Sequence, residues 1–181
     1  MIKLENDYIE LKELDFKYVM DMFEYSSDER VGKFSGFIPH KTKEEALDMM
    51  SMLKDKNEVW GIYHKQDKKL IGTIGVHSGG KHPIHKIEVN GMGFELNPKY
   101  WGKGIMSMAC DLALEYFFLE LGGEVIYANH FDFNIRSKRF ITKYGMELEG
   151  HWYSKSKQFN NSIYKMTKDN FIKNRKNTLK S

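Results

Sequence analysis

A strand, a glycine-flanked turn and the start of a helix follow one another over residues 93–107. The turn contains Gly102 and Gly104, and an apolar helical pattern begins at Ile105. Free backbone amides at a helix N-terminus bind anions, and glycine lets an anion come close to the backbone. The turn could therefore hold a pyrophosphate. A plain turn with a glycine-dependent bend is the alternative that these residue types leave open.

Two common phosphate-binding motifs do not match this turn. No segment has the Walker pattern, in which Lys and then Ser or Thr follow the last glycine. The dinucleotide fingerprint needs a third glycine where Ser107 stands, and it needs a strand directly before the turn, where residues 97–101 intervene. The next strand ends in Asn129 and His130 rather than in a ribose-binding acid. The sequence therefore argues against both a P-loop and a Rossmann fold.

The composition is that of one folded domain. The chain has 181 residues, of which 41% are hydrophobic and 14% aromatic, enough for a core of its own. One cysteine, Cys110, excludes an internal disulfide framework and a cysteine-based zinc site. A net charge of +3, from 28 basic and 25 acidic side chains, is too even to indicate a nucleic-acid-binding protein. We expect a single domain over residues 1–172 and a basic, frayed tail over residues 173–181.

No segment is expected to enter a membrane. The most apolar stretch, residues 105–121, carries Asp111, Glu115 and Glu120. The N-terminus lacks the apolar run of a signal peptide. We therefore expect a cytoplasmic monomer or homodimer, with neither membrane nor nucleic acid among its partners.

Hydrophobic periodicity predicts strands and helices along the whole chain. A capping-box spacing from Thr42 to Glu45 marks one helix start, and glycines at 122–123 and at 145 end two helices. Residues 26–41 are expected to be irregular. The predicted strands are residues 8–12, 58–64, 69–77, 87–96, 125–130, 147–153 and 162–167, and the predicted helices are residues 15–25, 42–54, 105–121 and 134–144.

Several segments, by their order and spacing along the chain, resemble the GNAT superfamily of N-acetyltransferases. The turn Tyr100-Trp101-Gly102-Lys103-Gly104-Ile105-Met106-Ser107 resembles the acetyl-CoA pyrophosphate loop of that family. Residues 134–150 resemble its second signature, residues 70–75 match its third strand, and residues 39–45 resemble the lid of the RimJ/RimL-like branch. The resemblance covers residues 8–171. It implies the GNAT fold, an α/β fold with a mixed, mostly antiparallel, splayed sheet of six or seven strands and helices on both faces.

The resemblance also implies how acetyl-CoA binds. The pantetheine arm would pair with the backbone of residues 94–96, and the amides of residues 102–107 would hold the pyrophosphate. Asn134 would contact the pantetheine arm, and the Ser137 hydroxyl would protonate the leaving thiolate. Taken alone, Asn134 and Ser137 are also explained by helix capping and first-turn polarity. The expected cofactor-binding residues are Phe94, Glu95, Leu96, Trp101, Gly102, Lys103, Gly104, Ile105, Met106, Ser107, Asn129, Asn134, Ser137 and Phe140.

The acceptor would be the primary amine of a protein N-terminus or of a small molecule, and it must be neutral to attack the thioester directly. Near pH 7.4, deprotonating a lysine-type amine costs about 4 kcal/mol, and an α-amine costs under about 1 kcal/mol. A general base lowers this cost, and Glu88 and Glu95 lie on the strand before the turn. We expect Glu95, which is closer to the turn, to be the catalytic base. A solvated strand carboxylate is the alternative.

Two departures from the family pattern leave a rival function open. Trp101 stands where Arg or Gln is usual, and Met106 stands at a small-residue position. The alternative is therefore a catalytically silent relative that binds acetyl-CoA as a sensor or binding module. A weaker alternative is an RNA- or ribosome-associated protein that uses the basic tail.

Three histidines, His77, His82 and His85, surround a pair of glycines and suggest a metal site. Their spacing fits no standard zinc finger, and no cysteine lies near them. We expect no metal.

Overall fold

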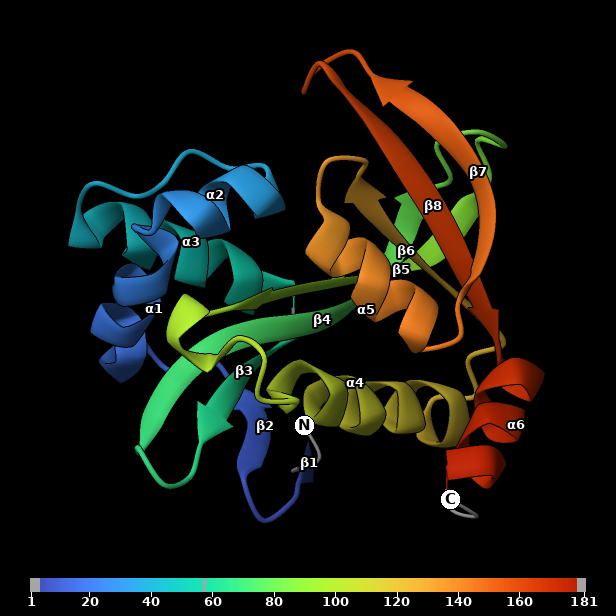
Figure 1. Cartoon of the computed structure of the whole chain (residues 1–181). Coiled ribbons are helices and arrows are strands. Elements are labelled where there is room, and N and C mark those ends of the chain that lie inside the picture. Colours follow the sequence, from blue (N-terminus) through green and yellow to red (C-terminus); the bar gives the residue numbers. More distant parts are fainter. Residues whose placement is uncertain (1–3, 57, 179–181) are drawn as a thin grey trace. The chain divides into compact units, whose positions relative to one another are not determined.

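The computed structural model describes residues 4–56 and 58–178, which fall into two compact units. The first unit contains the chain up to Val76 together with Gly93–Tyr116, and the second contains His77–Met92 and the chain from Phe117 onward. Strands β4 (Lys69–Lys81) and β5 (Glu88–Leu96) run through both units. Figure 1 shows the elements in chain order.

Four strands of the first unit pair antiparallel with one another. They are β1 (Leu4–Glu5), β2 (Ile9–Glu13), β3 (Val59–His64) and the first part of β4, and the end of β5 also belongs to this unit. On β2, Ile9 and Leu11 are buried and Glu10 and Lys12 are not, which is the alternation expected of a strand with one covered face.

The second unit continues the strand order. Its part of β5 pairs in parallel with β6 (Val125–Phe131), and β6 pairs antiparallel with β8 (Phe159–Thr167), which pairs antiparallel with β7 (Glu147–Ser154). The order is β1-β2-β3-β4-β5-β6-β8-β7. The predicted α/β fold with a mixed, mostly antiparallel sheet is confirmed. The described residues form eight strands rather than six or seven, because the two residues of β1 are too few to give a periodic pattern.

Three helices lie together in the first unit (Figure 1): α1 (Val19–Ser26), α2 (Glu29–Ser35) and α3 (Lys43–Asp55). The predicted cap of α3 is present, since Thr42 accepts a hydrogen bond from the backbone N–H of Glu45 at 3.3 Å. The segment that contains α2 was expected to be irregular, and this expectation is wrong. Asp28 caps the start of α2, and Gly36 ends it with a φ of 79°.

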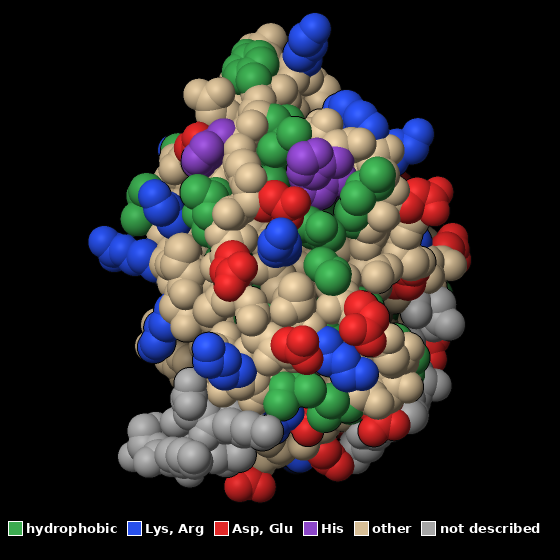
Figure 2. Space-filling view, turned by 90° about the vertical axis from the view of Figure 1, so that its right-hand side faces the viewer, with side chains coloured by type: hydrophobic (Ala, Val, Ile, Leu, Met, Phe, Trp, Pro, Cys, Tyr) green, Lys and Arg blue, Asp and Glu red, His purple; other side chains and the backbone are tan. Residues whose placement is uncertain are grey.

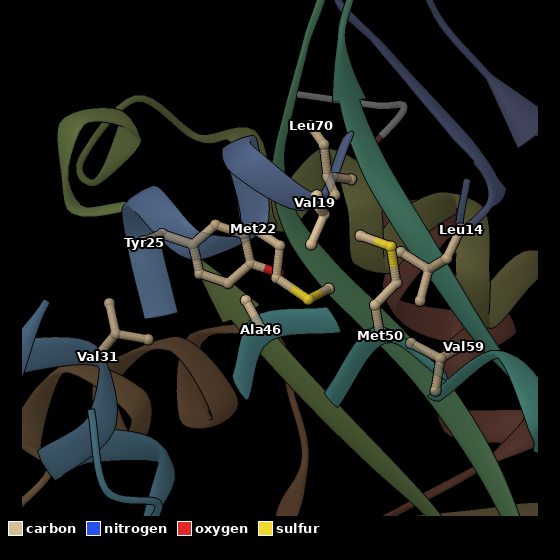
Figure 3. Close-up of a cluster of buried hydrophobic side chains, with 9 residues drawn as sticks. All are labelled: Leu14, Val19, Met22, Tyr25, Val31, Ala46, Met50, Val59 and Leu70. Carbon is tan, nitrogen blue, oxygen red and sulfur yellow. The ribbon is translucent and has the colours of Figure 1, made fainter. Parts of the chain in front are cut away.

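One hydrophobic core joins these helices to β3 and β4 (Figure 3). It contains Leu14, Val19, Met22, Tyr25, Val31, Ala46, Met50, Val59 and Leu70. Burying a large apolar side chain stabilises a fold by roughly 1.5–3 kcal/mol. This core therefore fixes α1 and α2 against the strands.

The remaining helices follow the strands that lead to them. Helix α4 (Ile105–Glu115) follows β5 and continues into a π-helical turn, η3 (Tyr116–Glu120). In the second unit, α5 (Ile135–Lys143) follows β6, and α6 (Lys168–Thr178) follows β8. Phe118 and Phe171 stack there at 5.0 Å between ring centroids. Helix α6 includes residues 173–178 of the segment that was expected to be a frayed tail, and residues 179–181 lie outside the described part of the chain.

Within residues 4–56 and 58–178, no helix combines the length and apolar character needed to cross a bilayer.

Candidate functional site

The turn between β5 and α4 has the backbone geometry of an anion site. Gly102 and Gly104 both have a φ of 75°, a left-handed conformation that favours glycine. Among the described residues, a Cβ added to either would meet no atom within 4 Å, so the space beside the turn is open. No side chain of the described part of the chain caps α4 at Gly104, and the first amides of a helix have no acceptor within it. Residues 102–107, which are predicted to hold a pyrophosphate, form this open helix start.

A carboxylate on α1 anchors the residues just before the turn. Glu24 accepts hydrogen bonds from the Asn97 side-chain amide at 3.1 Å and from the Lys99 ammonium at 3.0 Å, and it pairs with Lys69. The hydrogen bond from Lys69 lowers the pKa of Glu24 to about 2. The sequence does not reveal this anchor, because the partners lie 45 to 75 residues away along the chain.

Two aromatic side chains of the turn point back into the first unit. The Trp101 indole N–H donates to the Leu96 carbonyl at 2.8 Å, and the Arg30 guanidinium lies 5.5 Å from the Trp101 ring centroid. Tyr100 is buried, and its hydroxyl donates to Asp67 in the turn between β3 and β4. Trp101 therefore braces the turn from inside.

The last residues of β5 lie close to β4. A Cβ on Gly72 would lie 2.2 Å from the carbonyl oxygen of Glu95, so glycine is needed for the two strands to approach here. Among the described residues, the register between β5 and β6 comprises Gly91 and Met92. Residues 94–96, which are predicted to pair with a pantetheine arm, follow that paired stretch.

The carboxyl group of Glu95 lies in the interior of the first unit. Its Oε2 is buried without a hydrogen-bond partner in the described part of the chain, and Ser35 hydrogen-bonds the group. Burial raises the pKa of Glu95 to about 7, which suits a general base near neutral pH. Burial, and then the Glu95 charge, raise the pKa of the neighbouring Tyr25 phenol. Glu88, the other candidate base, is exposed at the start of β5.

The other predicted site residues lie in the second unit. Asn134 is buried and caps α5, since its Oδ1 accepts a hydrogen bond from the Ser137 backbone N–H at 3.0 Å. The capping role of Asn134 is thus real, and any cofactor contact is additional to it. Ser137 is half-buried, Asn129 is exposed on β6, and the Phe140 ring lies 5.6 Å from that of Tyr144.

The structure adds Glu149 on β7 to His82 and His85, the two members of this cluster that the sequence indicates. Their potential ligand atoms lie within 4.8 Å of one another. However, His82 Nδ1 accepts backbone N–H groups of Ile84 and His85 at 3.3 and 3.1 Å, so the proton of the neutral ring is on Nε2. A metal-binding histidine needs a lone pair on the ligating nitrogen and donates with the other. Lys165, at 3.8 Å from Glu149, already supplies a cation. Within the described residues, His82 Nε2 and Glu149 Oε2 are buried without a hydrogen-bond partner, and this tautomer of His82 leaves only His85 and Glu149 with lone pairs for a cation.

The chain matches the family model described as acetyltransferase (GNAT) domain over residues 9–147. The chain belongs to the GNAT acetyltransferase family. It is 33% identical over 144 residues to the Bacillus subtilis N-acetyltransferase YnaD, covering 77% of this chain and 79% of that protein. It is 28% identical over 175 residues to YoaA of the same organism, covering 91% of this chain and 96% of YoaA. The resemblance inferred from the sequence is confirmed at the level of the superfamily.

Solved structures share this GNAT fold. A GNAT-family acetyltransferase from Bacillus anthracis matches with a TM-score of 0.78 and 22% identity, covering 93% of this chain and 99% of that chain. A ribosomal-protein-S5-alanine acetyltransferase from Vibrio fischeri matches with a TM-score of 0.69 and 18% identity, covering 94% and 99%.

GNAT acetyltransferases take their acetyl group from acetyl-CoA, and this N-acetyltransferase has residues that fit that donor. Two glycines with positive φ leave open space at an uncapped helix start, where a pyrophosphate can approach backbone amides. Lys103, between them, is exposed and carries a positive charge.

Proposed function

We propose that this enzyme transfers the acetyl group of acetyl-CoA to a primary amine by direct attack, without a covalent enzyme intermediate. One observation carries the proposal. The unit that contains the open turn also contains Glu95, a carboxyl group whose pKa burial raises to about 7. A binding module needs only the turn, whereas a carboxyl group with a pKa near neutrality serves proton transfer.

The residues that would hold the donor are those that the sequence predicts. The amides of residues 102–107 and the Lys103 ammonium would bind the pyrophosphate, and the backbone of residues 94–96 would pair with the pantetheine arm. Asn129, Asn134 and Phe140 would also contact the donor. When bound, acetyl-CoA supplies an acetyl group activated as a thioester.

Two side chains of this chain move protons. Glu95 in its ionised form accepts a proton from the attacking amine. At pH 7 both forms of a carboxyl group with a pKa of about 7 are populated, so Glu95 can also release that proton. The Ser137 hydroxyl, in the first turn of α5, gives a proton to the departing sulfur.

The acceptor that we favour is a protein α-amine, as in the RimJ/RimL-like branch, with small-molecule amines as the second class. Residues 39–45 support this branch, and so does the fold likeness to a protein named ribosomal-protein-S5-alanine acetyltransferase. An α-amine also costs under about 1 kcal/mol to deprotonate at pH 7.4. Since β4 and β5 pass through both units, we propose that residues 1–172 act as one catalytic domain.

The test has two stages. Calorimetric titration with acetyl-CoA should show selective micromolar binding, and NAD and ATP should not bind. Release of free thiol should then depend on an added amine, drawn from a peptide with a free α-amine, spermidine and an aminoglycoside. Binding without transfer to any amine supports the silent relative. Absence of acetyl-CoA binding would contradict the predicted donor site.

A further inference from the structure

The carboxyl group of Glu95 is buried, and no charged side chain of the described residues shifts its pKa. On the face that Figure 2 shows, basic and acidic side chains lie among one another at the surface, where water screens their charges. Glu95 Oε2, by contrast, is buried without a hydrogen-bond partner in the described part of the chain. Burial raises the pKa of the group, and a hydrogen bond from Ser35 lowers it. The Ser35 hydroxyl is therefore the group that stabilises the ionised form of this base.

Ser35 is the last residue of α2, and the backbone around it is fixed. The N–H of Gly36 donates to the Gly32 carbonyl at 2.8 Å, and a φ of 79° at Gly36 ends the helix there. The chain then closes back on α1. The backbone N–H of His40 donates to the Ser26 carbonyl at 3.0 Å, and the His40 ring hydrogen-bonds the Ser26 hydroxyl at 2.8 Å. These bonds hold Ser35 in one position.

Helix α2 also contacts the turn that is predicted to bind the donor. The ring centroid of Phe34 lies 6.4 Å from that of Trp101, and the Arg30 guanidinium lies 5.5 Å from the same ring. The Trp101 indole in turn donates to the carbonyl of Leu96, the residue after Glu95. All of these residues belong to the first unit. One short helix therefore contacts both the buried carboxyl group and the predicted donor turn.

The hydrogen bond between Ser35 and Glu95 has a fixed direction. An ionised carboxylate only accepts hydrogen bonds, so the Ser35 hydroxyl is the donor. Burial, and then the Glu95 charge, raise the pKa of the Tyr25 phenol, so this neighbour on α1 stays neutral near pH 7. Ser35 is exposed, so a hydroxyl at the surface supports a carboxylate whose Oε2 no described residue uses as an acceptor.

We propose that Ser35 is the positioning residue of the catalytic base, and that its hydroxyl keeps the Glu95 carboxylate ionised and oriented to accept a proton from the substrate amine. This deepens the proposed function and rests on it. An N–H bond of the substrate ammonium breaks, its electron pair stays on the nitrogen, and an O–H bond forms on a carboxyl oxygen of Glu95. A hydrogen bond to a charged acceptor is stronger than one to the neutral group, so Ser35 favours the form that accepts the proton.

Removal of the Ser35 hydroxyl should change the pH at which the base works. In Ser35→Ala the ionised carboxylate loses its donor, so the pKa of Glu95 should rise by about one unit. At pH 6, kcat/KM for the amine should then be about tenfold lower than in wild type, and at pH 9 the two should agree within about twofold. Both proteins are assayed with the same amine, so the ionisation of the substrate affects them equally.

Two further variants separate the hydroxyl from the helix that carries it. Ser35→Thr keeps a hydroxyl at this position and should restore the wild-type pH profile. The matched control is Ser27→Ala, which removes a hydroxyl of the same unit that donates to the Glu24 carbonyl at 3.3 Å; its profile should match wild type. A merely structural role of Ser35 would lower kcat/KM by the same factor at every pH. Such a uniform loss in Ser35→Ala, or an unchanged profile, overturns the proposal.

Carbon-13 NMR of the glutamate carboxyl groups follows the same ionisation without turnover. The resonance that disappears in Glu95→Gln reports on Glu95, and its titration midpoint should lie near pH 7 in wild type and higher in Ser35→Ala. Equal midpoints in the two proteins overturn the proposal. If the wild type acetylates an amine and Ser35→Ala keeps the wild-type profile, only the role of Ser35 fails. If no amine is accepted at any pH, the proposed function fails and the role of Ser35 fails with it.

Discussion

The indole N–H of Trp101 donates to the backbone carbonyl of Leu96 at 2.8 Å and so ties the start of the turn to the end of β5. Relatives usually have Arg or Gln at this position, which suggested a weakened donor site. In the structure, Trp101 supports the turn through its side chain. Its ring is flanked by Arg30 and by Phe34, and among the described residues no atom lies within 4 Å of a Cβ added at Gly102 or Gly104. The substitution therefore changes how the turn is supported, and the silent-relative alternative loses part of its basis.

Gly104→Val should abolish donor binding. Valine at a φ of 75° is strained, and its methyl groups would occupy the open space in which a pyrophosphate approaches the amides. We expect the Kd for acetyl-CoA to rise by about 100-fold or more in a calorimetric titration. Unchanged affinity would remove residues 102–107 from the site.

Gly122→Val is the matched control for that variant. Gly122 has a φ of 70° and also has no atom within 4 Å of an added Cβ, so the substitution imposes the same kind of backbone strain. Both variants should lose about 1–2 kcal/mol of stability, and Gly122→Val should bind acetyl-CoA like wild type. Equal loss of affinity in both variants would mean that strain, and not obstruction, explains the effect.

Glu24→Gln should raise KM for acetyl-CoA several-fold and leave kcat nearly unchanged, because it releases Asn97 and Lys99 before the turn. The pKa of Glu24 is lowered from 4.5 to about 2 by the hydrogen bond from Lys69. The folded state therefore gains stability from this carboxylate above pH 4.5 and loses it as pH falls toward 2. Urea unfolding at pH 7 should show a loss of about 1 kcal/mol. Glu13→Gln, which removes a pair with Lys54, is the control that should leave KM unchanged.

The sequence predicts most of the fold because its signals are local. The capping box of α3 and the glycine at the end of α5 each act within a few residues. The failures have local causes too. Helix α2 has seven residues and β1 has two, so neither spans enough positions for periodicity to show.

The site is predicted less completely, because its support comes from distant parts of the chain. Spacing alone predicts Gly102 and Gly104 as site residues, and the family resemblance adds Ser137 as a further prediction. No local pattern indicates that Glu24 anchors residues 97–99, or that Ser35 hydrogen-bonds Glu95. Such pairings arise only when the helices pack against the strands.

Glu95→Gln should stabilise the protein at alkaline pH and abolish most turnover. The pKa of Glu95 is raised by burial from 4.5 to about 7, so the folded state binds more protons than the unfolded state between these values. Wild-type stability should therefore fall as pH rises from 4.5 to 7, by up to about 3 kcal/mol. Urea unfolding at pH 5 and pH 8 should show this fall in wild type and not in Glu95→Gln. Glu88→Gln, at the exposed start of β5, should keep the wild-type pH dependence, and a wild type that is equally stable at both pH values would contradict the assignment.

Ser137→Ala should separate catalysis from binding. The hydroxyl is expected to give a proton to the departing sulfur, whereas the backbone N–H of Ser137, which Asn134 accepts, is unchanged by the substitution. We expect kcat to fall by about 10–100-fold while the Kd for acetyl-CoA stays within twofold. The comparison is Thr142→Ala, which deletes a hydroxyl on the same helix that donates to the Lys138 carbonyl. A fall in kcat for both variants, or a parallel loss of binding in Ser137→Ala, would show that the hydroxyl maintains α5 and takes no part in proton transfer.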